Sequence, residues 1–296
     1  MSQARAWMIA ARPRTLPAAA SPVLVGSALA YQAGGFAPGP AAGAMAGALL
    51  LQIGSNLAND VYDFERGADS VARLGPVRVT QAGLLSGDEV KRGMWIAFGL
   101  ATLIGAYLTT VAGWPVVAIG LASITVAIAY TGGPFPLGYR GLGDLFVLLF
   151  FGFVAVCGTA FVQVGEIPAA SWPAGLMIGC LASAILVVNN VRDHETDRIA
   201  GKRTLAVILG RGFGVVEYGF LLAVAYVAAY SMVWFQYVST WALLSFLTLP
   251  VAVGLFVHVR KYRGPVLNST LAHTAQLLFL FSVLFSAGVV VGVLVR

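Results

Sequence analysis

Long apolar stretches alternate with polar segments along the chain, and this pattern predicts membrane-spanning helices. A helix needs about 20 predominantly apolar residues to cross the hydrocarbon core of a bilayer. Stretches near that length predict an all-α membrane protein of nine transmembrane helices around a central cavity, in one domain that covers residues 1–296. The expected spans are residues 15–34, 38–58, 93–112, 115–131, 143–164, 173–191, 212–234, 239–258 and 270–295.

Composition supports the membrane assignment. The chain is 59% hydrophobic and 10% charged, whereas soluble domains carry about 25% charged residues. The net charge of +6 need not indicate nucleic acid, which we do not expect as a partner, because cytoplasmic loops of membrane proteins are rich in Lys and Arg. The expected environment is the lipid bilayer.

The basic residues fall on one side of the predicted membrane. With the N-terminus in the cytoplasm, the inside segments contain every Lys and Arg of the 18 present except Arg296. This asymmetry predicts a bacterial-type cell membrane protein with a cytoplasmic N-terminus and an outside C-terminus. The two long polar loops, residues 59–92 and 192–211, then lie on the cytoplasmic face. We expect the active site there, because function concentrates in long loops.

Two acidic segments follow the second and sixth apolar stretches. They read NLANDVYDFERGAD at residues 56–69 and NNVRDHETDRIAGK at residues 189–202. Each contains an Asn-x-x-x-Asp pattern, which predicts that spans one to four and five to eight are halves of a parallel repeat. The ninth span would be an addition. The two acidic segments would then face each other across the central cavity.

The spacing within these segments suggests a metal site. Residues three and four apart share one face of a helix, so the Asn and Asp residues of each segment are expected to point the same way. Converging carboxylates repel one another unless cations bind between them. Oxygen ligands without Cys or His suit Mg²⁺, which commonly completes its shell with water and substrate phosphate. The expected sets are Asn56, Asp60 and Asp63, and Asn189, Asp193 and Asp197.

These segments resemble the UbiA-type superfamily of intramembrane prenyltransferases. NDxxD at residues 59–63 and DxxxD at residues 193–197 are similar to its two aspartate motifs, and the wider resemblance is to the branch that prenylates 1,4-dihydroxy-2-naphthoate. It runs in order from about residue 10 to residue 210. One departure is Gly67, where many relatives outside this branch have Asp; the next acid is Asp69. The other matching segments are ARPRTLPAAASPVLVGSALA at 11–30, GPVRVTQAGLLS at 75–86, YTGGPFPLGYRGLGD at 130–144 and the extension of the second acidic segment to residue 210.

The resemblance implies a Mg²⁺-dependent enzyme. It would transfer a polyprenyl group from polyprenyl diphosphate to 1,4-dihydroxy-2-naphthoate with decarboxylation, which yields demethylmenaquinol in menaquinone biosynthesis. A pair of Mg²⁺ ions is expected on Asp60, Asp63, Asp69, Asp193 and Asp197; all but Asp69 are also the expected catalytic residues. The expected diphosphate ligands are Asn56, Asn59, Arg78, Lys202 and Arg203, and the candidates for the acceptor or the carbocation are Tyr62, Tyr130, Tyr139, Asn189, Asn190 and Arg192.

Two alternatives stay open at this point. A sibling enzyme would use the same chemistry with 4-hydroxybenzoate, homogentisate or another acceptor. A transporter would use the acidic residues as a cation or proton site. Transport predicts acidic residues near the bilayer midplane and a route to both sides. Here the acidic residues cluster at one edge and the outside loops are short, which favours an enzyme.

Overall fold

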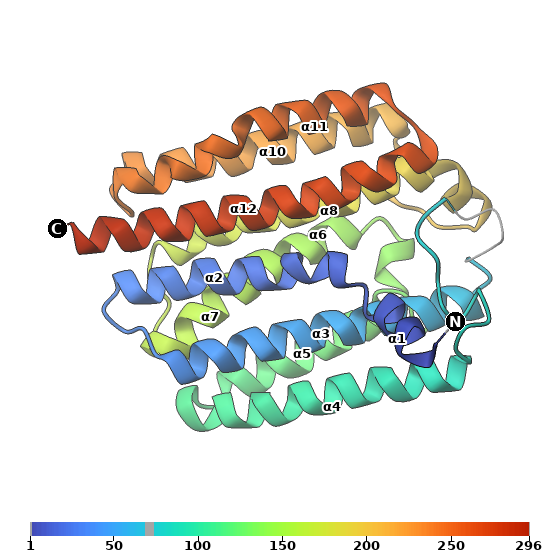
Figure 1. Cartoon of the computed structure of the whole chain (residues 1–296), viewed down its shortest axis with the longest axis horizontal. Coiled ribbons are helices and arrows are strands. Elements are labelled where there is room, and N and C mark those ends of the chain that lie inside the picture. The colour runs from blue at the N-terminus through green and yellow to red at the C-terminus, as the bar shows by residue number, and fades with distance from the viewer. Residues whose placement is uncertain (1, 69–73, 296) are drawn as a thin grey trace.

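The computed structural model describes residues 2–68 and 74–295, and the regular elements within them are helical. The long helices run side by side along one direction, and the two ends of the chain lie at opposite ends of the bundle (Figure 1). The expected metal ligand Asp69 lies outside the described residues.

The helices occupy all nine predicted stretches. Three consecutive elements, α6, the π-helical η3 and α7, form one continuous span over Gly143–Val164, and η4 and α11 form another over Thr240–Lys261. The bounds are α1 Gln3–Ala11, α2 Leu16–Gln32, α3 Pro38–Glu65, α4 Gly87–Ala112, α5 Pro115–Ala129, α6 Gly143–Val147, η3 Leu148–Val154, α7 Ala155–Val164, α8 Ser171–Ile199, α9 Leu205–Ile208, α10 Arg211–Trp234, η4 Thr240–Thr248, α11 Leu249–Lys261 and α12 Leu267–Leu294.

Seven helices within the described residues are long and apolar enough to cross a membrane. The two remaining predicted spans correspond to α2, with 17 residues, and α5, with 15. Both fall short of the roughly 20 residues that a perpendicular span requires. The structure therefore supports a helical membrane protein with seven candidate spans.

The two expected cytoplasmic loops are shorter than predicted. Helix α3 continues to Glu65 and α8 to Ile199, so both acidic segments are largely helical. The apolar pattern ends earlier than the helices because the last turns bury polar side chains, including Asp60, Asp63 and Asp193. The short helix α1 was not predicted; its buried Ala6 and Ala10 pack in a cluster with residues of α3.

Helix α8 lies at the centre of the packing, and 78% of an apolar 18-residue stretch within it is buried. Small residues allow this close approach, as is common between membrane helices. A Cβ on Gly152 of η3 would lie 2.3 Å from the carbonyl oxygen of Gly175 and 2.8 Å from Cα of Gly179, both in α8. The backbone of η3 therefore contacts α8 directly, which fixes the depth of the second acidic segment.

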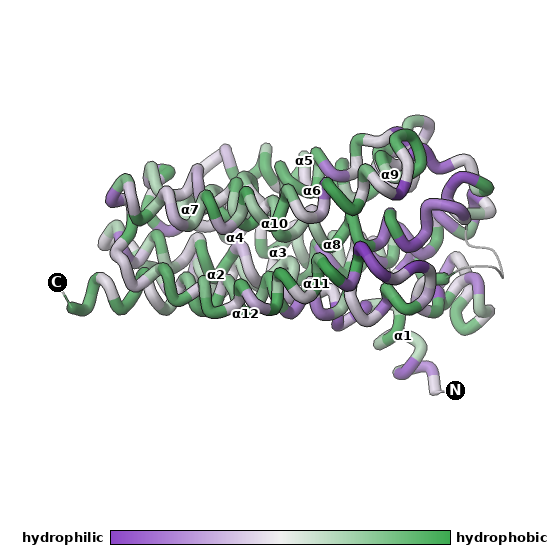
Figure 2. Tube along the Cα trace, turned by 90° about the horizontal axis from the view of Figure 1, so that it is seen from above, coloured by the Kyte–Doolittle hydropathy of each residue, from purple (hydrophilic) through white to green (hydrophobic). Residues whose placement is uncertain are grey.

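Polar residues gather at the end of the bundle that carries the N-terminus (Figure 2). Helix α4 begins at this end with a capping box, in which Ser86 Oγ accepts from Glu89 N and Glu89 Oε2 accepts from Ser86 N. Such reciprocal bonds satisfy backbone donors that a helix start leaves unpaired. The capping box thus marks where the segment between α3 and α4 ends.

Candidate active site

A pocket of about 860 Å³ opens at the polar end of the bundle. Asp63 from the first acidic segment lines it together with Asp193 and Asp197 from the second. The structure thus brings acidic residues from α3 and α8 to one cavity. Bases also line it: Arg12, Arg14, Arg78, Arg192 and Lys202.

Asp63 lies at the meeting point of several segments. Its Oδ2 accepts a hydrogen bond from Arg78 Nη2 at 3.1 Å, and its Oδ1 accepts one from the Tyr139 hydroxyl at 2.7 Å. Lys202 Nζ lies 3.2 Å from the same Oδ1. The carboxylate is 3% exposed and faces two cations. This surplus of positive charge leaves the surrounding pocket suited to a further anion.

Asp60 does not line the pocket. Its two oxygens accept hydrogen bonds from the backbone N–H groups of Val79 and Thr80, at 3.1 and 3.0 Å. These bonds hold the segment that carries Arg78 against α3. A buried carboxylate bonded to backbone donors is well satisfied without any metal.

Asn56 is likewise not among the residues that line the pocket. Its Nδ2 donates to the carbonyl oxygen of Ala11 at 3.0 Å and to Thr15 Oγ1 at 2.9 Å. Of the predicted set Asn56, Asp60 and Asp63, the structure brings Asp63 to the lining of this cavity and not the other two. The N-terminal segment covers Asn56 and the segment around Val79 covers Asp60, and the sequence pattern of one helix cannot reveal these contacts.

Arg192 is the centre of a second network. Its Nε donates to Asp193 Oδ1 at 2.7 Å, and its Nη2 donates to Asp193 Oδ2 and to Asn189 Oδ1. Its Nη1 donates to Asn268 Oδ1 at 2.7 Å. The guanidinium is fully buried, and each of its three nitrogens donates a hydrogen bond. Its donors are therefore engaged within the protein, which disfavours the predicted direct contact with an acceptor.

Two pocket residues have polar groups available for a ligand. The side chain of Asp197 and that of Asn190 make no hydrogen bond with another described residue. Asn190 is 6% exposed, and both side chains line the cavity. A side-chain amide can both donate and accept hydrogen bonds, so Asn190 is suited to bind a polar group of a substrate.

The other predicted residues divide between the pocket and its surroundings. Asn59 and Tyr130 line the pocket, as does Tyr139, whose ring lies 4.7 Å from Lys202 Nζ. Tyr62 lies outside it, beside Lys91, whose Nζ is 5.9 Å from the ring. Arg203 also lies outside: its side chain is exposed, and its backbone N–H donates to the carbonyl oxygen of Tyr139 at 3.0 Å.

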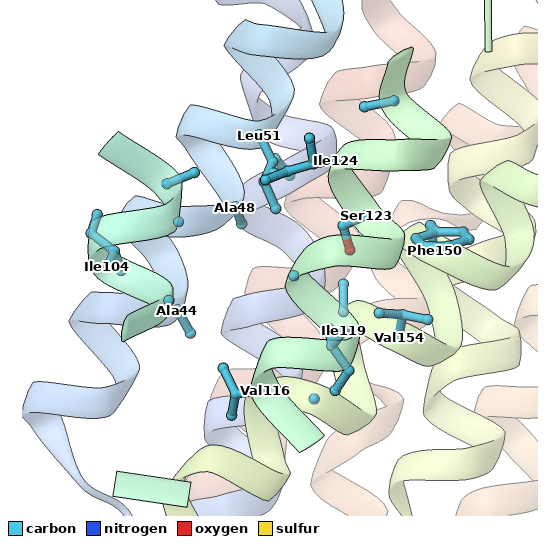
Figure 3. Close-up of a pocket in the computed structure, with 18 of the residues that line it drawn as sticks. Ala44, Ala48, Leu51, Ile104, Val116, Ile119, Ser123, Ile124, Phe150 and Val154 are labelled. Atoms are coloured by element: carbon cyan, nitrogen blue, oxygen red, sulfur yellow. The ribbon is translucent and has the colours of Figure 1, made fainter. Parts of the chain in front are cut away.

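A second pocket, of about 400 Å³, adjoins the first and is almost wholly apolar. It is lined by side chains of α3, α4, α5 and the α6–η3–α7 span, including Leu51, Ile104 and Ile119 (Figure 3). Four residues line both pockets: Gln52, Tyr130, Val147 and Phe151. The polar pocket therefore continues into an apolar one at the depth of Tyr130.

Glycines make room for Tyr130 at this junction. A Cβ on Gly138 would lie 2.9 Å from Cε1 of Tyr130, and one on Gly143 would lie 2.7 Å from its hydroxyl oxygen. Larger residues at these two positions would displace the ring. The glycines of the segment from Tyr130 to Asp144 thus position an aromatic face between the two pockets.

Sequence reasoning missed several pocket residues. Arg12 and Arg14 belong to a matching segment, and their basic charge beside a predicted span was the available signal. Gln52 lies one helical turn before Asn56, inside an apolar stretch, where a polar residue is itself a signal of function. Asn268 offered only a lone amide at the start of the last span.

The donor set fits Mg²⁺ delivered with a phosphate-bearing substrate. Within residues 2–68 and 74–295, no three His, Cys, Asp or Glu side chains are grouped closely enough to hold a metal alone. Mg²⁺ does not require such a cage, because it is usually bound by one or two carboxylates, waters and substrate phosphates. Asp63, Asp193 and Asp197 line the pocket together with bases, and they could hold Mg²⁺ that arrives with a phosphate-bearing substrate.

The helical fold with an acidic pocket fits an intramembrane prenyltransferase, and sequence comparison identifies the family. Residues 19–283 match the model of the UbiA prenyltransferase family, and the chain belongs to that family. It is 38% identical to the 1,4-dihydroxy-2-naphthoate octaprenyltransferase of Escherichia coli over 98% of this chain and 96% of that protein.

Solved structures of the family share the fold. A UbiA homologue from Aeropyrum pernix superposes with a TM-score of 0.73 at 17% identity, over 93% of this chain and 97% of the homologue. A homologue from Archaeoglobus fulgidus, bound to GPP and Mg²⁺, has a TM-score of 0.64 at 14% identity, over 95% of this chain and 99% of its own.

Proposed function

We propose that this protein transfers a polyprenyl group from polyprenyl diphosphate to 1,4-dihydroxy-2-naphthoate, with loss of CO₂, in menaquinone biosynthesis. The single observation that carries the proposal is the 38% identity, along nearly the whole chain, to an enzyme named for that acceptor. The pocket supports it, because an acidic, base-rimmed cavity adjoins an apolar one. A diphosphate and an isoprenoid chain need that combination.

The diphosphate is assigned to the polar pocket. Lys202 and Arg78 flank Asp63 and would contact phosphate oxygens, as would Arg12 and Arg14 at the rim. Charge-assisted bonds to phosphate are roughly twice as strong as neutral ones. Asp63, Asp193 and Asp197 would hold a pair of Mg²⁺ ions, while Asp60 and Asn56 keep the surrounding segments in place.

Bound Mg²⁺ would supply Lewis-acid stabilisation of the departing pyrophosphate. The bases of the pocket add fixed positive charge where the negative charge of the leaving group develops. Because the reacting carbon is allylic, the C–O bond can break without a strong nucleophile. The electron pair leaves with the pyrophosphate, and an allylic cation remains.

Tyr130 is assigned to the cation. It lines both pockets, so its ring lies where the diphosphate end of the donor meets its apolar chain. An aromatic face stabilises a nearby cation without reacting with it. Tyr139 suits this role less well, because Lys202 already lies over its ring and Asp63 binds its hydroxyl.

The isoprenoid chain is assigned to the apolar pocket. The walls are aliphatic, and glycines at positions 47, 105, 120 and 158 leave room between α3, α4, α5 and α7. Burial of a long hydrocarbon there contributes about 25 cal/mol per Å². Such a pocket recognises the chain by its apolar character.

The acceptor is assigned to the side of the polar pocket formed by α8. Asn190 is buried there and is free to bind a hydroxyl or carboxylate of an aromatic acid. The electron-rich ring would attack the allylic cation, forming the C–C bond. Loss of the carboxylate as CO₂ then leaves its electron pair in the ring and restores the aromatic quinol.

We also propose that α2 and α5 cross the membrane with the seven longer candidates, giving nine spans. The opposite positions of the two chain ends are consistent with an odd number of crossings (Figure 1). The grouping of basic residues supports a cytoplasmic N-terminus and a cytoplasmic active site in a bacterial-type cell membrane. The parallel repeat is part of the same proposal, supported by acidic residues that reach one pocket from both α3 and α8.

Product analysis tests the proposed function. Purified protein is incubated with Mg²⁺, a polyprenyl diphosphate and either 1,4-dihydroxy-2-naphthoate or 4-hydroxybenzoate, and products are identified by mass spectrometry. We expect prenylated, decarboxylated quinol from the naphthoate. Product from 4-hydroxybenzoate alone would instead assign the protein to the sibling enzymes that share this chemistry.

A further inference from the structure

Asn268, in the first turn of α12, uses both ends of its amide at the active site. Its Oδ1 accepts from Arg192 Nη1 at 2.7 Å, and its Nδ2 donates to the carbonyl oxygen of Leu74 at 2.9 Å. The residue also lines the polar pocket. It lies far beyond the matching motifs in the sequence, near the start of the last helix.

The first contact connects Asn268, through Arg192, to the proposed metal ligand Asp193. Arg192 donates to Asp193 through Nε and Nη2, and the third nitrogen of the same guanidinium, Nη1, donates to Asn268. Because this guanidinium is fully buried, loss of an acceptor would leave N–H groups without a partner, at a cost that favours rearrangement. The orientation of Asp193 therefore depends on Asn268 through one intermediate residue.

The second contact leads to the phosphate-binding side. Leu74 precedes Arg78, which donates to Asp63, and Val79, whose backbone is held by Asp60. Asn268 thus joins the segment that carries Arg78 to the helix that carries Asp193. One amide connects the two halves of the pocket.

The first turn of α12, which carries this amide, also makes contacts outside the pocket. Leu267 beside it is fully buried, and the hydroxyl oxygen of Thr270, two residues on from Asn268, lies 2.7 Å from Nδ1 of His258. The first turn of α12 is therefore anchored independently of the pocket. A side chain that projects from such a turn can position its neighbours.

We propose that Asn268 is a positioning residue that fixes the Arg192–Asp193 pair, and with it the affinity of the site for a divalent cation with diphosphate. The proposal rests on the proposed function for the metal-binding role of Asp193 and for the identity of the diphosphate. Residues that hold metal ligands from behind typically change metal affinity by about 10- to 100-fold when they are removed. Asn268 has no predicted contact with either substrate.

The test measures binding without turnover. Mn²⁺ replaces Mg²⁺, inorganic pyrophosphate replaces the donor head, and free Mn²⁺ is followed by electron paramagnetic resonance. Asn268→Leu keeps the branching at Cγ but removes both hydrogen bonds, and we expect Mn²⁺ binding in the presence of pyrophosphate to weaken by about tenfold or more. If the leucine variant does not fold, Asn268→Ser, which is too short for either contact, is expected to give the same loss.

A double-mutant cycle tests the route through Arg192. Arg192→Lys removes the two-pronged contact with Asp193, so adding Asn268→Leu should weaken Mn²⁺ binding by no more than about twofold further, because coupled residues are not additive. Ser269→Ala is the control, since Ser269 is exposed and its hydroxyl bonds only to the carbonyl of Val266. Unchanged Mn²⁺ binding in Asn268→Leu, or independent losses from the two substitutions, would overturn the proposal. Neither result depends on which acceptor the wild-type protein uses.

Discussion

Nζ of Lys202 lies 3.2 Å from Oδ1 of Asp63, and this ion pair joins the two acidic segments across the pocket. Lys202 reaches Asp63 because α8 ends in a tight turn: Gly201 adopts a φ of +73°, and the Lys202 N–H donates to the carbonyl oxygen of Asp197 at 2.8 Å. A residue with a side chain would be strained at that φ. The Gly-Lys pair after the second acidic segment therefore has a structural reason.

Replacing Lys202 should weaken donor binding. In Lys202→Met the pocket loses a cation beside the diphosphate, and we expect the KM for polyprenyl diphosphate to rise about tenfold or more, as for loss of a charge-assisted bond of about 1.5–3 kcal/mol. Steady-state kinetics measure this. Lys261→Met is the control, because Lys261 is exposed and does not line the pocket. An unchanged KM in Lys202→Met would remove Lys202 from the diphosphate site.

Replacement of Asp60 and replacement of Asp63 should affect Mg²⁺-dependent turnover differently. Asp63→Asn removes a proposed metal ligand, and turnover should fall about 100-fold or more; loss of the charge beside the buried Arg78 should also lower thermal stability. Asp60→Asn places an amide N–H against the backbone N–H of Val79 or Thr80. It should therefore destabilise the protein by about 1–3 kcal/mol.

Thermal unfolding and Mg²⁺-dependent kinetics distinguish the two variants. Glu195→Gln serves as the control, because Glu195 is 76% exposed and lies outside the pocket. A greater loss of Mg²⁺ affinity in Asp60→Asn than in Asp63→Asn would contradict the assignment of Asp60 to the segment around Val79.

Filling the apolar pocket should restrict the protein to donors with short isoprenoid chains. Gly105 of α4 lines this pocket, and a Cβ there meets nothing within 4 Å. Gly105→Phe should therefore leave short donors such as geranyl diphosphate active and lower kcat/KM for long polyprenyl donors. Gly99→Phe is a matched control on the same helix, since Gly99 is exposed, has open space and does not line the pocket. Equal losses for short and long donors would contradict the assignment of the chain to this pocket.

Metal removal should abolish activity without unfolding the protein. Asp60, Asp63 and Asp193 are already held by Arg78, Arg192, Lys202 and backbone donors, so the helices do not need the metal to form. Chelation should stop pyrophosphate release while circular dichroism stays helical, and Mg²⁺ should restore release. Turnover that persists after exhaustive chelation would contradict a Mg²⁺-dependent mechanism.

The helical architecture and the two acidic segments could be predicted because apolar length and local spacing determine them. The roles within each segment could not. Asn56, Asp60 and Asp63 share a face of α3, but only the fold shows that Ala11 and Val79 cover the first two. Asn268 was missed for the same reason, since its partners Leu74 and Arg192 are distant in sequence.

The fate of the carboxyl carbon of the acceptor provides the most direct test of the proposed prenyl transfer with decarboxylation. The purified protein is supplied with Mg²⁺, a polyprenyl diphosphate and 1,4-dihydroxy-2-naphthoate labelled with ¹³C in its carboxylate, and labelled CO₂ and pyrophosphate are measured together. We expect them in equal amounts, with a prenylated quinol that has lost the label. Pyrophosphate released without labelled CO₂, or a prenylated product that keeps the carboxylate, would contradict the account.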